Sequence, residues 1–164
     1  FWRADDALVD WTFRRGVTAR TANAVDITVA GFELAARRSW ANWDVVLGYT
    51  GLSKNHDYRG ALVDASFYAL NYPRHRLTAA ITARLGGGWE IRFDNEARWQ
   101  AGNFLRTTRR DALISALGVY FRPPQVRNLT VGVQVDNLWD SDSQDVPAVP
   151  AAKRQITGSV TYTW

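Results

Sequence analysis

The residue types that most often carry catalytic chemistry are sparse in this chain and are not grouped. The 164 residues include no Cys and two His, His56 and His75. A disulfide, a thiolate nucleophile and a thiolate metal site are therefore excluded. Neither His has a second ligand at metal spacing, and both lie in or beside one predicted loop, so no Ser-His-Asp arrangement stands out. We predict no enzyme activity, no cofactor and no metal site.

Three carboxylates near the C-terminus, Asp140, Asp142 and Asp145, resemble the start of a calcium loop. An EF-hand requires Gly at the sixth position and Glu at the twelfth, where this chain has Asp145 and Ala151. A solvated acidic loop is the favoured interpretation, with weak loop calcium as the alternative. The glycines at 86–88 precede a strand and not a helix, which favours a tight turn over a phosphate cradle.

Aromatic and Arg side chains in two long links are the best candidates for ligand contact. Aromatic rings stack on planar or sugar-like ligands, and Arg binds carboxylate or phosphate with a fork of donors. The links are 52–73 and 101–110. Plain solvation or contact with lipopolysaccharide is the alternative for any one residue. The candidates are His56, Tyr58, Arg59, Tyr68, Tyr72, Phe104, Arg106 and Arg109.

These loops must be positioned by strands, because apolar and polar residues alternate along most of the chain. In 89–100, Trp89, Ile91, Phe93 and Trp99 share one parity, broken by Asn95, while the other parity is charged or polar. A strand sends successive side chains to opposite faces, so this segment predicts a strand with one apolar and one charged face. Similar patterns occur at 9–13, 25–37, 43–50, 76–85, 111–121, 129–136 and 156–164.

About eight strands are therefore expected, most near the nine to eleven residues that a tilted membrane strand needs. Trp43, Trp89, Trp99 and Trp164 lie at strand ends on the apolar parity, as in the aromatic belts of membrane proteins. In 25–37 the apolar parity changes, and we predict a β-bulge near Ala30 and Gly31 that restores the face.

The links between these strands alternate between short and long. The short links are 38–42, 86–88 and 122–127; the long links are 14–24, 52–73, 101–110 and 139–152. Outer-membrane barrels have short periplasmic turns and long extracellular loops. The alternation predicts an antiparallel up-and-down transmembrane β-barrel segment, with every long loop outside the cell.

Composition agrees with a folded β protein that is not a nucleic-acid partner. The chain has 20 Lys and Arg against 16 Asp and Glu, a net charge of +4, and the Arg residues are scattered rather than gathered in one stripe. No apolar run is long enough for a membrane helix. The absence of Met predicts a processed chain or a segment of a longer one.

Several patches resemble TonB-dependent outer-membrane receptors of bacteria. The stretch D-A-L-V-D-W at 6–11 resembles their D-L-I-D-W strand, and 18–23 followed by 31–34 resembles their A-x-N and G-x-E-L stretch. Residues 135–140 resemble their N-L-F-D element, with Trp139 in place of Phe. The closing residues 158–164 resemble the family's last strand.

The last strand carries a second resemblance. Tyr162 and Trp164 end the chain on one parity, as in the C-terminal signature of bacterial outer-membrane proteins that the barrel-assembly machinery reads.

The resemblance implies a 22-stranded barrel with an N-terminal plug domain, of which residues 1–164 would be the C-terminal part without the plug. It implies a receptor in the bacterial outer membrane that takes up a siderophore, cobalamin or glycan and is energised through TonB. The expected partners are outer-membrane lipid, lipopolysaccharide, the barrel-assembly machinery, a small ligand and, through the missing N-terminal part, TonB.

Two alternatives remain open at this point. Eight strands can close into a small barrel with a filled interior, and such a barrel would act as an adhesin or structural anchor. A soluble β-sandwich binding module is the weaker alternative, because its strands usually run five to six residues.

Overall fold

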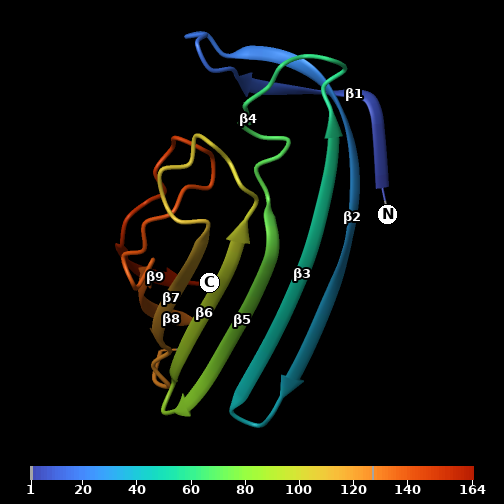
Figure 1. The fold of residues 1–164 in the computed structure, drawn as a ribbon. Helices are drawn as coiled ribbons and strands as arrows, with labels where there is room; N and C mark the ends of the chain where they lie inside the picture. Colours follow the sequence, from blue (N-terminus) through green and yellow to red (C-terminus); the bar gives the residue numbers. More distant parts are fainter. Residues whose placement is uncertain (1, 127) are drawn as a thin grey trace.

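The described part of the chain folds into one antiparallel sheet (Figure 1). The computed structural model describes residues 2–126 and 128–164, and these form nine strands in the order β4-β1-β2-β3-β5-β6-β7-β8-β9. Phe1 and Arg127, a predicted edge residue and the end of a predicted short link, lie outside the described residues. The strands are β1 (Trp2–Phe13), β2 (Thr21–Ser39), β3 (Trp43–Asp57), β4 (Ala65–Ser66), β5 (Pro73–Gly86), β6 (Trp89–Gln100), β7 (Asp111–Phe121), β8 (Leu129–Asp136) and β9 (Gln155–Tyr162).

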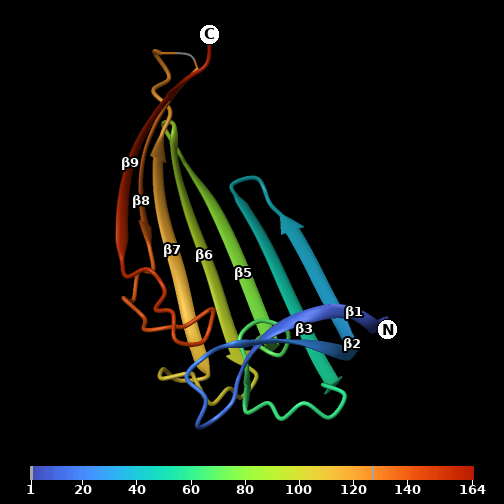
Figure 2. The same ribbon diagram turned by 90° about the horizontal axis from the view of Figure 1, so that it is seen from above.

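The predicted all-β, antiparallel, up-and-down arrangement is confirmed. Each predicted strand is present, and the two-residue β4 is an addition inside the longest predicted loop. The described sheet is open: β9 pairs with β8 on one side, and no described strand lies on its other side. Figure 2 shows β1 and β9 at opposite sides of the sheet. Among the described residues there is no helix that could cross a membrane.

The two ends of the sheet differ in the length of their links. Short links follow β2, β5 and β7 at the lower end in Figure 1, and the four long loops gather at the upper end. The turn between β5 and β6 depends on glycine. Gly88 has φ +88°, and a Cβ there would lie 2.0 Å from the carbonyl oxygen of Arg122. The predicted alternation of short and long links is therefore present except at 14–20 and 122–128, which have the same length.

The strand register gathers apolar side chains on one face, which we call the apolar face. Residues paired across neighbouring strands point to the same side of a sheet. Leu34, Val133 and Val160 on this face are 65%, 51% and 72% exposed, so no described segment covers them. In order from β2 to β9, this face carries Phe32, Leu34, Tyr49, Leu47, Leu77, Ile81, Phe93, Ile91, Leu117, Val119, Val133, Val131, Val160 and Ile156.

The opposite face, which we call the polar face, is held together by ion pairs. The buried carboxylate of Glu90 receives Arg92 Nε at 2.8 Å and Arg122 Nη1 at 3.1 Å. Arg76 Nη2 lies 2.6 Å from Glu96 Oε2 on the neighbouring strand. Charges paired across strands in this way compensate one another. The alternating pattern read from the sequence therefore corresponds to two chemically distinct faces.

Asn95, the one polar interruption predicted on the apolar face of β6, is satisfied locally. Ser115 Oγ donates to Asn95 Oδ1 at 2.7 Å, and Trp139 Nε1 donates to Ser115 Oγ at 2.7 Å. Ser115 is 1% exposed. The three side chains supply one another with hydrogen-bond partners where the surrounding surface is apolar.

The predicted bulge at Ala30 and Gly31 is wrong. β2 pairs with β3 in one uninterrupted register from Asp26 to Ser39, and the register shift lies in β1 instead, between Ala4 and Leu8. The parity changes because the apolar side chains of the two halves of β2 lie on different faces of the sheet. Near the loops, Val25 and Ile27 are buried on the polar side, whereas Phe32 and Leu34 lie on the apolar face.

Candidate functional site

The β3–β5 loop (58–72) folds back over β1 and β2 on the polar side of the sheet. Its anchor is an apolar cluster in which Val25, Ile27 and Tyr58 are 0%, 3% and 8% exposed. Burying these side chains under the loop removes them from water and fixes the loop's course. The residues packed against them are Leu8, Val29, Val63, Ala69 and Leu70.

The same loop also pairs with the edge of β1. β4 pairs with Thr12 and Phe13, and the amides of Asp64 and Phe67 donate to the carbonyls of Phe13 and Trp11, both at 2.9 Å. Part of the open edge is thereby covered, which limits pairing with other chains there.

Tyr58, a predicted ligand-contact residue, is tied to a buried carboxylate. Its hydroxyl donates to Asp10 Oδ2 at 2.7 Å, and Asp10 Oδ1 accepts from the amides of Tyr68 and Ala69 at 3.3 and 3.2 Å. Burial, with the neighbouring Asp10 adding to it, raises the pKa of Tyr58 above its usual range. The phenol hydroxyl therefore stays protonated and holds the loop to β1.

His56 and Arg59 flank Tyr58. His56 lies in β3 opposite Ile27, which corrects its predicted place in a loop, and its ring meets the Tyr58 ring edge-on at 5.5 Å. Arg59 Nε and Nη2 each lie 3.1 Å from a carboxylate oxygen of Asp26. Arg59 thus forms a bidentate ion pair at the loop end of β2.

Phe104 joins the β6–β7 loop (101–110) to the N-terminal strands. Its ring stacks on Phe13 at 6.2 Å, and the guanidinium of Arg15 lies 4.0 Å from its centroid. A hollow of about 200 Å³ between the β3–β5 and β6–β7 loops is lined by His56, Tyr58 and Phe104 among others. The structure therefore brings these three predicted candidates together.

Tyr72 and Tyr68 have different environments. Tyr72 is 7% exposed, its hydroxyl accepts from the amide of Lys54 at 2.9 Å, and the Lys54 ammonium lies 4.9 Å from its ring centroid. Tyr68 is 55% exposed. Tyr72 thus belongs to the packed base of the loop, while Tyr68 faces outward.

Arg106, also predicted, joins three loops. It donates to the carbonyl of Gln144 in the β8–β9 loop (137–154) and to Asn71 Oδ1 in the β3–β5 loop. The Gln144 side chain in turn forms two hydrogen bonds with Thr107, to Oγ1 at 2.8 Å and from the amide at 3.0 Å. Asn71 Nδ2 donates to the carbonyl of Asp145. The three loops are fastened at this point.

Arg98 connects the loops joined by Arg106 to the sheet. It lies near the loop end of β6 on the polar face, donates to the carboxylate of Asp145, and has Nη1 3.5 Å from Glu96 Oε1. The Arg98 side chain is 12% exposed and that of Asp145 is 65% exposed. We call Gln144 and Asp145 the latch, because they connect the β8–β9 loop to Arg106 and Arg98.

The group formed by Arg98, Arg106 and the latch contains polar atoms that could form further hydrogen bonds. Arg98 Nε, Arg106 Nε and Gln100 Oε1 are buried and have no hydrogen-bond partner in the described structure. Burial, and next the positive charge of Arg98, lower the pKa of Arg106. Two partly buried guanidinium groups lie near Asp145 and near Glu96, which is shared with Arg76, so the loop end of the polar face is electropositive.

Sequence reasoning named Arg106 and missed Arg98 as a site residue. Asp145 was considered only for a calcium loop. In the sequence Arg98 is one of several charged residues on the polar parity of 89–100, and Asp145 lies far from it in the chain. The signal that was present is Arg98's parity at the loop end of β6, which places its side chain beneath the long loops.

The remaining predicted residues lie outside this cluster. Arg109 Nε and Nη2 lie 3.1 and 2.9 Å from the Asp111 carboxylate, and the Arg109 side chain is 83% exposed. Tyr162 pairs with Leu129 at the turn end of the sheet, and Trp164 is fully exposed. The predicted barrel-assembly residues are thus at the end away from the long loops.

The acidic stretch of the β8–β9 loop makes its own ion pair. Lys153 Nζ lies 2.5 Å from Asp142 Oδ1, and this hydrogen bond raises the pKa of Lys153. Asp140 Oδ1 accepts from the amide of Arg154 at 3.0 Å. Within the described ranges, no three His, Asp or Glu side chains gather closely enough to hold a metal ion.

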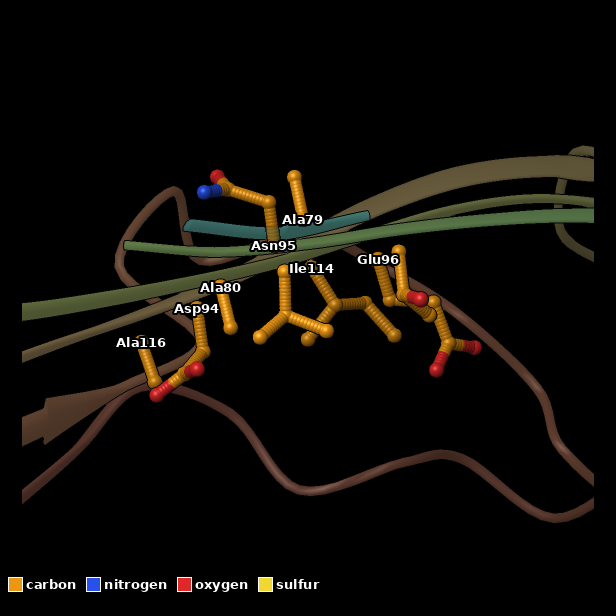
Figure 3. A pocket seen from close by; sticks show the side chains of 9 residues that line it. Ala79, Ala80, Asp94, Asn95, Glu96, Ile114 and Ala116 are labelled. Carbon is orange, nitrogen blue, oxygen red and sulfur yellow. The ribbon is translucent and has the colours of Figure 1, made fainter. Parts of the chain in front are cut away.

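Below the loops, the polar face has a shallow hollow of about 320 Å³. Small side chains form its floor, and Asp94 and Glu96 stand beside them. Figure 3 shows Ala80, Asp94 and Glu96 on one side of the sheet and Asn95 on the other. No cluster of catalytic groups is present among the residues that line this hollow.

Comparison with known proteins identified no relatives. No protein-family model matches the chain, and no curated protein and no solved structure is significantly similar to it.

Proposed function

We propose that this chain is part of the wall of a TonB-dependent receptor in the bacterial outer membrane, the C-terminal part of a 22-stranded barrel. The observation that carries the proposal is the exposed apolar face, which continues across the strands from β2 to β9 opposite an ion-paired polar face. Exposing so large an apolar surface to water is unfavourable, whereas contact between this surface and lipid is favourable.

Aromatic side chains at both ends of the apolar face support a membrane setting. Trp43 and Trp89 lie near the short turns and are 49% and 48% exposed; Trp99 lies near the long loops and is 47% exposed. From Trp89 to Trp99, at about 3.3 Å per residue, β6 spans roughly 33 Å. With a tilt of about 40° the height is about 25 Å, that of the apolar band of outer-membrane barrels.

The two ends also support an orientation. Long loops at one end and short turns at the other fit loops outside the cell and turns in the periplasm. In this orientation the loop cluster around Arg106 and the hollow beside Phe104 meet the medium first, where a small ligand would be captured. The plug and the TonB-contacting segment would come from other parts of the protein.

The open edge favours this proposal over a self-contained eight-stranded barrel. A closed small barrel would pair β9 with β1, and the described register contains no such pairing. An exposed strand edge invites pairing with further strands, which a larger barrel supplies.

Fractionation and growth assays test the proposal. We expect the full-length protein in the outer-membrane fraction, and we expect cells lacking it to lose growth on a limiting siderophore, cobalamin or glycan to the same degree as cells lacking TonB. A full-length protein that remains in the buffer after ultracentrifugation, without detergent, would overturn the proposal.

A further inference from the structure

Arg98 and Arg106 are held by bonds that leave part of each guanidinium unused. Arg98 uses its Nη groups for Asp145 and Glu96, and Arg106 uses its own for Gln144 and Asn71. The Nε of each is buried without an acceptor among the described residues. A buried donor that lacks a partner is unfavourable, so a group offering more acceptor oxygens than the latch would be held more tightly.

The charge balance points to the chemistry of that group. Arg98 and Arg106 come from different elements, and Asp145 and Glu96 oppose them. Glu96 is shared with Arg76, whose Nη2 lies 2.6 Å from it. The site therefore has more positive than negative charge, and an anion completes it.

Asp145 is the replaceable member of the cluster. Its side chain is 65% exposed, whereas that of Arg98 is 12% exposed. Asp145 can return to water at little cost, but Arg98 would be left as a partly buried cation with only a shared carboxylate nearby. Asp145 is thus expected to leave when another anion takes its place.

We propose that Arg98 and Arg106 form a binding site for a carboxylate or phosphate group of a soluble ligand, and that Asp145 is an internal competitor which the ligand displaces. Displacement of Asp145 breaks the ion pair that ties the β8–β9 loop to β6, and the loop is then held there by Gln144. This inference deepens the proposed uptake function and rests on it for the biological role. The anion is soluble because Arg98 lies on the polar face, opposite the apolar face, and Arg106 contacts the same β8–β9 loop as Arg98.

A binding assay on the full-length protein in detergent tests the site. Val149 in the β8–β9 loop is 52% exposed, and the 164 residues contain no Cys. A Val149→Cys variant, with any Cys elsewhere in the full-length protein replaced by Ser, can therefore carry an environment-sensitive dye at this one position. Citrate and inorganic phosphate are the probes, and sodium chloride at equal ionic strength is the control. We expect both probes, and not chloride, to change the dye signal.

Charge variants decide between the site and general attraction. Asp145→Asn should bind citrate about tenfold more tightly, because it removes the competitor, whereas Arg98→Gln and Arg106→Gln should bind about tenfold more weakly. The matched controls, Asp142→Asn in the same loop and Arg109→Gln in the neighbouring loop, should bind as the unsubstituted protein does.

The proposal is overturned if Asp145→Asn binds citrate no more tightly, or if Arg109→Gln weakens binding as much as Arg106→Gln. Misfolding cannot imitate the expected gain of affinity in Asp145→Asn. The assay needs neither TonB nor a membrane: citrate binding by a protein absent from the outer membrane would sink the proposed function alone, and an outer-membrane protein without the Asp145→Asn gain would sink the anion site alone.

Discussion

At the scale of single residues, the loop end of the sheet is organised by polar groups that hold loops in place. Asp10 is 2% exposed and accepts from the Tyr58 hydroxyl and from two backbone amides. A buried carboxylate is stable only when its oxygens are bonded in this way. The Tyr58–Asp10 hydrogen bond therefore holds the β3–β5 loop to the sheet, as the Asp145–Arg98 ion pair holds the β8–β9 loop. The Tyr58–Asp10 bond is buried, so a ligand in solution does not easily displace it.

Ionisation of Tyr58 should lower the free energy of unfolding at alkaline pH. Its pKa is raised in the folded protein, so its contribution is fully present below the ordinary Tyr pKa of about 10 and is lost as the pH rises above it. We expect Tyr58→Phe to lower the free energy of unfolding by about 1 kcal/mol near neutral pH and to flatten the alkaline decline. Urea unfolding in micelles at several pH values measures both effects.

Tyr68→Phe is the matched control, because Tyr68 is 55% exposed. It should keep the neutral stability and the alkaline decline of the unsubstituted protein. An equal change in both variants would contradict the role given to Tyr58.

At the scale of elements, a large side chain that packs over glycines fixes the position of one strand relative to its neighbour. The Tyr120 ring lies over Gly118 of its own strand and Gly132 of β8, where added Cβ atoms would approach the ring to 2.6 Å. Tyr120 Oη also donates to Gln134 Oε1 at 2.8 Å. An aromatic ring covering glycines in this way pins the register of β7 against β8.

Gly118→Ala should therefore destabilise the protein. The added methyl forces the Tyr120 ring aside, with an expected loss of about 1–3 kcal/mol of unfolding free energy. Gly158→Ala in β9 is the control, since nothing lies within 4 Å of a Cβ there, and it should be neutral or slightly stabilising. Thermal unfolding in micelles compares the two, and equal losses would contradict the role of Tyr120.

The alternation in the sequence predicted the strands well because side-chain parity is a local property. It failed at β2, where the parity change of Val25 and Ile27 against Phe32 reflects a loop from elsewhere in the chain covering half of the strand. The latch was beyond sequence reasoning for the same reason. Arg98 meets Asp145 only because the β8–β9 loop folds across to β6. The strand pattern places aromatic and Arg residues in the predicted loops, but only the fold shows which of these side chains contact one another.

At the scale of the whole molecule, the sheet separates two environments and two ends. One face is apolar and exposed, the other is polar and ion-paired, and the long loops lie together at one end (Figure 1). Val133 and Gln134 are neighbours in β8 that point to these opposite faces. A charged side chain should therefore be tolerated at Gln134 and not at Val133.

Val133→Arg should impair insertion into the outer membrane, with an expected cost of about 2–4 kcal/mol near the middle of the bilayer, whereas Gln134→Arg should cost much less. Comparing the fraction of each full-length variant that folds into lipid vesicles measures the difference. An equal loss in the two variants would contradict a lipid contact at Val133.

The central claim is that lipid covers the apolar face, and spin-label accessibility in vesicles tests it most directly. Single Cys labels at Leu47, Val133 and Val160 should collide more often with oxygen, which concentrates in hydrocarbon, than with a water-soluble nickel complex. Labels at Thr82, Gln134 and Thr157 on the polar face should show the lower oxygen preference of a site away from lipid. Labels at Leu47, Val133 and Val160 that collide mainly with the nickel complex would contradict the account.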